Sequence, residues 1–531
     1  MAARLDVSFL WHMHQPCYHN AATGEVMLPW VRLHATKAYL DMAEALARAP
    51  SNVSCVVNFV PVLLDQLGKY GRGEIKDTFL ELSKKPADSL ELDEARFLLR
   101  YFFMANWETM VRPHRRYHEL LVKRGLDQAT WDLDRGAKRF TPEELRDLQV
   151  WFNLSWFGWA AKAKFPVVAE MIAKGGNFTE EDKAAVLQAQ LDCINAVVPA
   201  WRAVADSGRA EISATPFYHP ILPLLINTRH AARAMPDATL PEDYIAPEDA
   251  YAQVERAAAF HERTWGRRPA GMWPAEGSVS PEVVPVFRKS GLKWICSDED
   301  VLFRSLGRQN REQDLYRPWM AANGGEEIAM FFRDRTLSDL VGFTYSKMSP
   351  RDAANDFLSR VQNIQRGATS EKPVAAVILD GENPWEWYPD GGEAFLRQLY
   401  EGLGSSPDIR ATTFTRHLED RAGARIEPLG SLHSGSWINA NYRIWIGHPE
   451  DNAGWTLLKR TREDVRAHLD ALSPEDRERV MDNLYRAEGS DWFWWYGDDH
   501  SSGNDQAFDE LFRTHLRNVY RFIGRTPPFF L

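Results

Sequence analysis

Seven short apolar runs, each ending in polar residues, constrain the fold of this chain more than any other feature. Runs of this kind, rich in β-branched residues, are typical of parallel strands that are buried on both faces. The runs are Leu5 to His12, Val53 to Phe59, Arg209 to Thr215, Gly271 to Ala275, Lys293 to Ser297, Ile328 to Arg333 and Val374 to Asp380. The sequence therefore predicts an α/β protein with a parallel sheet, whose strand ends carry the candidate functional groups.

Segments with helical periodicity interrupt and follow these strands. A helical insertion is predicted over 65–205, where Thr141-Pro142-Glu143-Glu144 and Thr179-Glu180-Glu181-Asp182 have the pattern of helix starts. Beyond the seventh strand the pattern is again helical. We therefore predict a barrel over 1–400 and a mainly helical C-terminal domain over 401–531 that closes over the candidate active site.

Charge and cysteine content exclude several classes of protein. Lys and Arg number 63 against 74 Asp and Glu, giving a formal net charge of −11, so nucleic acid is not an expected partner. The four cysteines form no Cys-x-x-Cys pair, which argues against a zinc knuckle or a dense disulfide framework. No apolar run is long enough to span a bilayer, and the N-terminus lacks the features of a signal peptide. We expect a cytoplasmic protein with no membrane partner.

Reactive side chains follow three of the predicted strands closely. The first strand ends in His12-Met13-His14-Gln15-Pro16, and the spacing places both imidazoles on one face of an extended chain. The fourth leads to Glu276, and the seventh ends in Asp380. Two carboxyl groups across a barrel mouth suit a glycosidase, in which one attacks or stabilises the sugar carbon and the other protonates the leaving oxygen.

Aromatic residues support a carbohydrate ligand. The chain has 20 tryptophans, and the C–H face of a sugar packs well on an aromatic plane. Trp151, Trp156 and Trp159 lie at helical spacing and are predicted to pack in a core, as are Phe493 and Trp495. The candidate substrate-binding residues are His12, His14, Gln15, His219, Trp273, Glu382, Trp385, Trp437, Asp491 and Trp492.

Acidic and basic residues after the fifth and sixth strands have two interpretations. Asp298, Glu299 and Asp300 follow the fifth strand, and Arg333, Asp334 and Asp339 follow the sixth. They either orient the catalytic pair or pair with one another. The sequence leaves both interpretations open.

Five segments, in order along the chain, resemble the signatures of glycoside hydrolase family 57. They are His12-Met13-His14-Gln15-Pro16, Glu211 to His219, Trp273-Pro274-Ala275-Glu276, Asp380-Gly381-Glu382-Asn383 and Ala487-Glu488-Gly489-Ser490-Asp491-Trp492. Five ordered matches are far more specific than one. The resemblance implies a seven-stranded parallel (β/α)7 barrel followed by a helical region, and an activity on α-glucans.

The same resemblance assigns roles to the two carboxyl groups. It implies Glu276 as nucleophile and Asp380 as acid/base of a retaining mechanism, with no metal and no cofactor. The aromatic fifth signature and Gly435-Ser436-Trp437-Ile438 look most similar to amylopullulanase-type members, which cleave α-1,4 and α-1,6 linkages. 4-α-Glucanotransferases and branching enzymes share the catalytic pair, and the sequence does not separate hydrolysis from transfer.

Two hypotheses from other classes also fit parts of the pattern. A metal-dependent polysaccharide deacetylase or mannosidase would use His12 and His14 with Asp380 or Asp298 as zinc ligands. A non-catalytic glucan-binding protein would keep the aromatic platforms without turnover. Because Glu276 and Asp380 are both present, we favour the retaining glycosidase.

Overall fold

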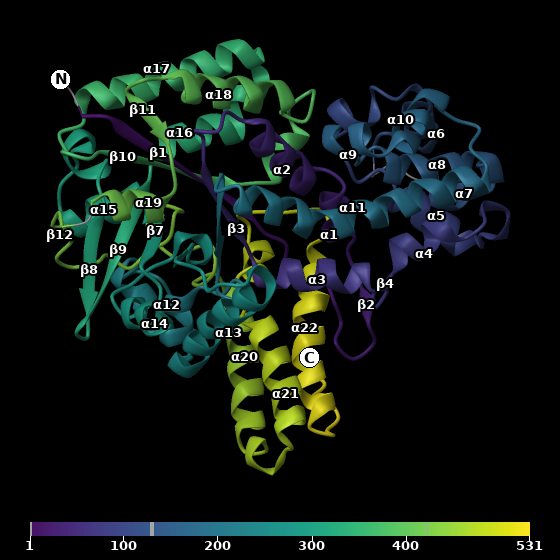
Figure 1. The fold of residues 1–531 in the computed structure, drawn as a ribbon. Coiled ribbons are helices and arrows are strands. Elements are labelled where there is room, and N and C mark those ends of the chain that lie inside the picture. Colours follow the sequence, from purple (N-terminus) through teal and green to yellow (C-terminus); the bar gives the residue numbers. More distant parts are fainter. Residues whose placement is uncertain (1–2, 128–131, 422) are drawn as a thin grey trace.

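Parallel strands close into a barrel at the centre of the computed structural model, which describes residues 3–127, 132–421 and 423–531 (Figure 1). The barrel order is β10-β1-β3-β5-β6-β7-β9, and the pair Ala376 and Arg333 joins β10 to β9 and closes the ring. The strands are β1 (Leu5–Met13), β3 (Cys55–Phe59), β5 (Ala210–Ala214), β6 (Gly271–Met272), β7 (Trp294–Asp298), β9 (Glu326–Arg333) and β10 (Val374–Asp380). The predicted seven-stranded (β/α)7 barrel is confirmed.

Several strands differ from the prediction at their ends or were not predicted. Strand β6 has only two residues, because the chain turns at Pro274 into a 3-10 turn that carries Glu276. The antiparallel strand β8 (Trp319–Asn323) pairs with β9 through a two-residue turn. That turn is Gly324-Gly325, whose positive φ angles suit a tight hairpin. Short pairings add β11 (Ile409–Ala411), β12 (Glu427–Pro428), and β2 (Glu25–Val26) with β4 (Lys76–Asp77).

Helices surround the barrel and fill the long insertion. The predicted starts at Thr141 and Thr179 are confirmed, since each side chain accepts a hydrogen bond from the backbone N–H of the third residue of its helix. The first half of the chain has α1 (Trp30–Ala35), α2 (Ala38–Arg48), α3 (Pro61–Gly71), α4 (Thr78–Lys84), α5 (Leu92–Tyr101), α6 (Arg115–Arg124), α7 (Leu133–Arg139), α8 (Pro142–Leu154), α9 (Trp159–Lys164), α10 (Pro166–Lys174) and α11 (Glu180–Asp206). In Figure 1, α4 to α10 stand together at one side of the barrel.

The second half of the chain supplies the remaining helices. They are α12 (Leu222–Ile226), α13 (Pro247–Trp265), α14 (Val283–Lys289), α15 (Glu299–Leu306), α16 (Arg335–Asp339), α17 (Pro350–Gly367), α18 (Glu393–Ser405), α19 (Phe414–Asp420), α20 (Pro449–Arg466), α21 (Pro474–Ala487) and α22 (Asp505–Phe522). Helices α20, α21 and α22 stand side by side below the barrel in Figure 1. The domain division at residue 400 stays a prediction. Strand β11 lies beyond that residue and still pairs with barrel strand β1.

The amino-terminal end of the barrel is plugged by apolar side chains. Phe414 of α19 packs on Trp294 and Phe331, with ring centroids 4.9 and 4.4 Å apart respectively. Glu211 lies at this end too, where Thr415 and Trp294 donate hydrogen bonds to its carboxylate. The plug leaves the carboxyl ends of the strands as the open end of the barrel. None of the described helices is long and apolar enough to cross a membrane.

Substitution of Gly271 by alanine tests the packing of the barrel interior. A Cβ at this position would lie 2.0 Å from Cδ2 of the buried Trp294 ring. We expect Gly271→Ala to reduce the free energy of unfolding by about 1–3 kcal/mol, as overpacked cores do. Urea-induced unfolding measures this change.

Gly68→Ala is the matched control. Its Cβ would meet only the flexible end of Arg72, in a helix where alanine is preferred over glycine. Equal stabilities for Gly271→Ala and the native chain would contradict the packing described for the barrel interior.

Candidate active site

A cavity of about 860 Å³ opens at the carboxyl ends of the barrel strands. Glu276, Asp380 and Glu382 line it together with His12 and His14. Further walls come from α1, from the insertion and from the segment between α21 and α22. The cavity therefore joins the barrel mouth to three regions that lie far apart in the sequence.

Backbone geometry brings the two carboxyl groups predicted as catalytic to this cavity. His12 is the register partner of Asp380, so β1 and β10 end at the same level of the barrel. Glu276 has a left-handed backbone with φ 57°, followed by Gly277 with φ 59°. A left-handed conformation costs a non-glycine residue about 1–2 kcal/mol, and such strain clusters at functional sites. The turn after β6 thus holds Glu276 in a conformation that local preference disfavours.

The Glu276 carboxyl group is buried among polar partners. Trp437 Nε1 donates a hydrogen bond to Glu276 Oε2 at 2.7 Å, and His219 Nδ1 lies 3.9 Å from Glu276 Oε1. Burial and the charge of Asp380 raise the pKa of Glu276, against the opposing effects of His14 and Trp437. A proton therefore binds readily to this group near neutral pH.

Asp380 is the second carboxyl group at the mouth. Asn383 Nδ2 donates a hydrogen bond to Asp380 Oδ2 at 3.2 Å. Burial raises the pKa of Asp380, while the charges of His14 and Arg333 oppose that rise. Because the charge of Asp380 also raises the pKa of Glu276, the pair favours a state with one carboxylate and one carboxylic acid.

His14 carries a positive charge among these acidic groups. Its Nε2 lies 2.5 Å from Asp491 Oδ1, and its backbone N–H donates to both carboxyl oxygens of Glu382 at 3.1 Å. Burial lowers the pKa of His14, but Asp491, Glu382 and Glu276 outweigh burial and raise it to about 8. Gln15 Nε2 donates to Glu382 at 3.0 Å, and burial with the charge of Asp380 raises the pKa of Glu382 to about 8.

Two neutral histidines lie beneath this charged layer in one hydrogen-bonded chain. Burial and the charge of His14 lower the pKa of His12 to about 3 and that of His219 well below its usual value. The amide oxygen of Asn58 only accepts, so His12 Nδ1 donates to it at 2.7 Å and His12 Nε2 accepts from His219 Nε2 at 3.2 Å. His219 Nδ1 then accepts from Ser490 Oγ at 2.8 Å. The chain fixes the tautomer of both rings.

The three histidines also form a candidate metal-binding group. One nitrogen of each of His12, His14 and His219 lies within 4.8 Å of the others. The rings are stacked, however, with His14 and His219 centroids 3.9 Å apart at 22° and His12 and His14 planes at 12°. An imidazole binds a metal along a lone pair in the plane of its ring, and lone pairs of stacked, nearly parallel rings do not converge on one point. The arrangement does not fit a three-histidine metal centre.

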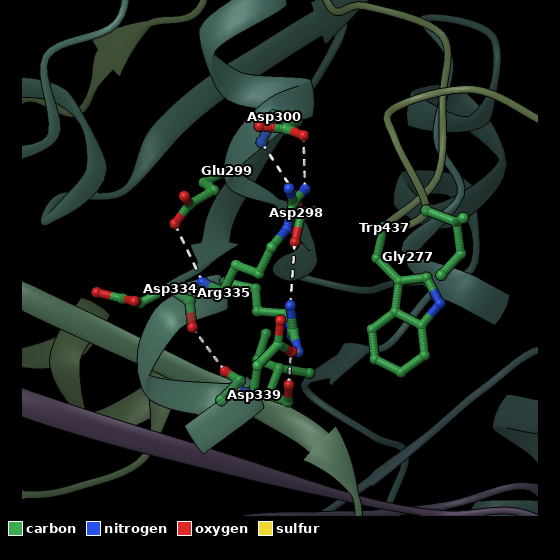
Figure 2. A network of polar contacts seen from close by, with 12 residues as sticks. Gly277, Asp298, Glu299, Asp300, Asp334, Arg335, Asp339 and Trp437 are labelled. Atoms are coloured by element: carbon green, nitrogen blue, oxygen red, sulfur yellow. Dashed lines mark hydrogen bonds and ion pairs between the residues drawn. The ribbon is translucent and has the colours of Figure 1, made fainter. Parts of the chain in front are cut away.

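A network of ion pairs that includes Asp298, Asp300 and Arg335 lies beside Trp437 (Figure 2). Arg333 pairs with Asp298 at 3.4 Å and with Asp339 at 2.5 Å. Its guanidinium group lies 5.4 Å from the ring centroid of Trp437, which donates to Glu276. The polar residues after the fifth and sixth strands therefore pair with one another, and Arg333 extends their network to the indole that contacts Glu276.

Not all residues predicted to bind substrate reach the cavity. His12, His14, Gln15, Glu382, Trp437 and Asp491 line it. His219, Trp273, Trp385 and Trp492 are buried behind the lining and contribute no wall. Trp385 Nε1 donates to the Gly381 carbonyl, Trp492 Nε1 donates to the Arg486 carbonyl, and Trp273 packs on Trp437. These four side chains lie behind the lining, and their contact with sugar stays a prediction.

Other aromatic residues line the cavity instead. Trp30, Trp107, Trp387 and Trp494 line the cavity and were not predicted to do so. Trp156 and Trp495 border it as well, although Trp156 is 1% exposed and packs in the core as predicted, and Trp495 is half-buried against that core. Trp387 is 65% exposed while its near neighbour Trp385 is 1% exposed. Both tryptophans follow Asp380 closely in the sequence, and the sequence alone does not show which of the two lines the cavity.

Residues 8–428 match the family model for glycosyl hydrolase family 57. The chain belongs to this family. The match covers every barrel strand except the first residues of β1, and it includes Glu276 and Asp380. The resemblance drawn from the five signatures is thereby confirmed.

Two curated relatives are similar to this family 57 chain over less than half its length. A 4-alpha-glucanotransferase of Thermococcus kodakarensis is 26% identical over 238 residues, which are 44% of this chain and 30% of that protein. An alpha-amylase of Pyrococcus furiosus is 27% identical over 224 residues, which are 41% of this chain and 29% of that protein. The match thus spans less than a third of each relative.

Solved structures of family 57 enzymes share the fold. A branching enzyme from Pyrococcus horikoshii superposes with a TM-score of 0.63 at 16% identity, covering 98% of this chain and 89% of that one. An alpha-amylase from Thermotoga maritima superposes with a TM-score of 0.58 at 14% identity, covering 98% and 93% respectively. At these identities the likeness establishes the architecture of the family 57 chain.

Replacement of Trp437 tests the electrostatics around Glu276. The indole N–H stabilises the ionised carboxylate, so Trp437→Phe should raise the pKa of Glu276 further. If ionised Glu276 is needed, the acidic limb of the pH–activity profile should move upward by about one unit. Trp201→Phe is the control, because it also loses an indole hydrogen bond but lies outside the cavity. Identical acidic limbs in the two variants would contradict this description of Glu276.

Proposed function

We propose that the protein is a retaining glycoside hydrolase that acts on α-glucans such as glycogen, maltodextrin or pullulan. The observation that carries this proposal is the pair Glu276 and Asp380, two half-buried carboxyl groups with raised pKa values that line one cavity at the barrel mouth. One proton shared between two carboxyl groups provides the acid and the nucleophile of double displacement. Membership of family 57 and the names of its relatives support an α-glucan as substrate.

In the proposed mechanism the shared proton first passes from Glu276 to Asp380, so that Asp380 protonates the glycosidic oxygen while ionised Glu276 attacks the anomeric carbon. The C–O bond to the leaving sugar breaks and an ester bond to Glu276 forms. Asp380, now ionised, removes a proton from the incoming hydroxyl, which displaces Glu276 with overall retention of configuration. His14 offsets the negative charge that the carboxylates accumulate.

Hydrolysis and transfer differ only in the second step. Water as acceptor gives an amylase or amylopullulanase, and a sugar hydroxyl gives a 4-α-glucanotransferase or branching enzyme. Sizing the products from a linear maltooligosaccharide separates these outcomes, because hydrolysis yields shorter chains only and transfer also yields longer ones. Pullulan as a second substrate reports the linkage, once the released trisaccharide is identified.

Glu276→Gln tests the proposed nucleophile. The amide is nearly the same size and its oxygen still accepts from Trp437, so we expect an intact fold. We expect kcat on maltoheptaose to fall by about 10⁴-fold or more, because an amide forms no glycosyl ester.

Glu211→Gln is the matched control, since Glu211 is also a hydrogen-bonded carboxyl group of the barrel but lies at the plugged end. Activity is compared per folded molecule, with thermal unfolding as the measure of folding. Near-native turnover by folded Glu276→Gln would refute the proposed function.

Dialysis against a strong chelator separates the carboxyl-pair mechanism from a metal-dependent deacetylase or mannosidase. Because the stacked histidines do not converge on one metal position, we expect glucan cleavage to be unchanged after dialysis. Loss of cleavage that added Zn²⁺ restores would favour the metal-dependent alternative. Tight glucan binding without any cleavage would favour a non-catalytic binding protein.

A further inference from the structure

Arg333 contacts groups that hold both carboxyl groups of the candidate active site, although it does not line the cavity itself. It is the last residue of β9 and is only 6% exposed. Its guanidinium group meets four separate segments, through Asp298, Asp339, Ile378 and Trp437. Any effect of Arg333 on a reaction at the mouth therefore passes through these neighbours.

The contact with Ile378 replaces a backbone hydrogen bond at the seam where the barrel closes. Strands β9 and β10 are joined there by the register pair Ala376 and Arg333, and β9 ends at Arg333. Arg333 Nε donates to the Ile378 carbonyl at 2.6 Å, and the Ile378 N–H donates to Ser338 Oγ at 3.1 Å. Buried backbone groups need such partners, so these two side chains hold the last part of β10. Asp380 lies two residues further on.

The contact with Trp437 holds the indole that bonds Glu276. The guanidinium group of Arg333 lies 5.4 Å from the centroid of the Trp437 ring. A planar cation over an indole is attracted by the ring electrons, and its packing limits how far the ring tilts. Trp437 Nε1 donates to Glu276 Oε2 at 2.7 Å, so the orientation of the ring sets the geometry of that hydrogen bond.

Two aspartates hold the guanidinium group and balance its charge. Asp298 and Arg333 are register partners in β7 and β9, so their side chains leave the same face of the sheet and pair at 3.4 Å. Asp339, at the end of α16, pairs with Arg333 at 2.5 Å. The rigid guanidinium fork serves several partners in fixed directions at once, which an ammonium group cannot do. Burial raises the pKa of Asp380, and the charge of Arg333 opposes that rise.

We propose that Arg333 is a positioning residue for both catalytic carboxyl groups. It holds the end of the strand that carries Asp380, and it holds the indole that bonds Glu276. One side chain thereby fixes the relative placement of two groups that come from distant segments of the sequence. The inference rests on the proposed function for the roles of Glu276 and Asp380, but not for the contacts that Arg333 makes.

Arg333→Lys tests this role. Lysine keeps a positive charge beside the two aspartates, so we expect an intact fold, which thermal unfolding checks. It offers no planar group to Trp437. Because Arg333 lies outside the cavity lining, we expect kcat on maltoheptaose to fall about tenfold while KM changes by less than about twofold. The acidic limb of the pH–activity profile should move upward, because a poorly placed indole stabilises the ionised Glu276 carboxylate less.

Arg335→Lys is the matched control. Arg335 also pairs with Asp298, at 2.5 Å, but its other ion pair is with Asp300 (Figure 2). We expect its kcat and its acidic limb to stay at the native values. Equal changes in the two lysine variants, or a rise in KM with native kcat in Arg333→Lys, would overturn the positioning role.

A measurement without turnover keeps the inference apart from the proposed function. In protein labelled with 5-fluorotryptophan, the ¹⁹F resonance of Trp437 is assigned by its loss in Trp437→Phe. Its titration with pH reports the ionisation of Glu276, to which the indole donates. We expect the midpoint to rise by about one pH unit in Arg333→Lys and to stay at the native value in Arg335→Lys.

The two proposals fail in different ways. If Glu276→Gln remains active, the proposed function fails, while this titration still decides whether Arg333 positions the indole. Equal midpoints in the two lysine variants would refute the positioning role, whatever the activity of Glu276→Gln.

Discussion

One imidazolium surrounded by four acidic groups is the interaction on which the rest of this site depends. His14 pairs with Asp491, bonds Glu382 through its backbone and lies in the field of Glu276 and Asp380. Without that positive charge, burial and mutual repulsion would protonate the carboxyl groups more fully, and no carboxylate would remain to attack. The hydrogen-bonded pair His12 and His219 beneath it stays neutral, which keeps a second positive charge away.

The barrel holds the closely spaced acidic groups and His14 in fixed positions. Register pairing fixes Asp380 beside His12, and a left-handed turn held by Trp273 and Trp437 fixes Glu276. At the other end Phe414 packs on Trp294 and Phe331 and plugs the barrel, while Glu276, Asp380 and Glu382 line the cavity at the mouth. Loops from the insertion and between the C-terminal helices add further walls to this cavity of about 860 Å³.

The local sequence was sufficient to predict which carboxyl groups lie at the barrel mouth, but it was insufficient to predict which tryptophans line the cavity. Asp380 was predictable because a strand direction determines where its last residue lies, and Glu276 because it follows Trp273-Pro274 at a strand end. Trp385 and Trp387 share one turn, and only packing of Trp385 against Trp11 and Tyr388 decides that Trp387 faces the cavity. Trp107 reaches the cavity through the tertiary position of the insertion, which no local pattern encodes. The antiparallel strand β8, which pairs with β9 through the Gly324-Gly325 turn, was not predicted.

The central claim is that Glu276 forms a bond to sugar. Its most direct test is to trap the intermediate with a fluorinated maltosyl fluoride, which slows the second step, and to map the labelled peptide by mass spectrometry. The account predicts a single glycosyl group on the peptide that contains Glu276, absent when maltose is added in excess as acceptor. Label on Asp380 or Glu382, or an active enzyme that never acquires label, would contradict it.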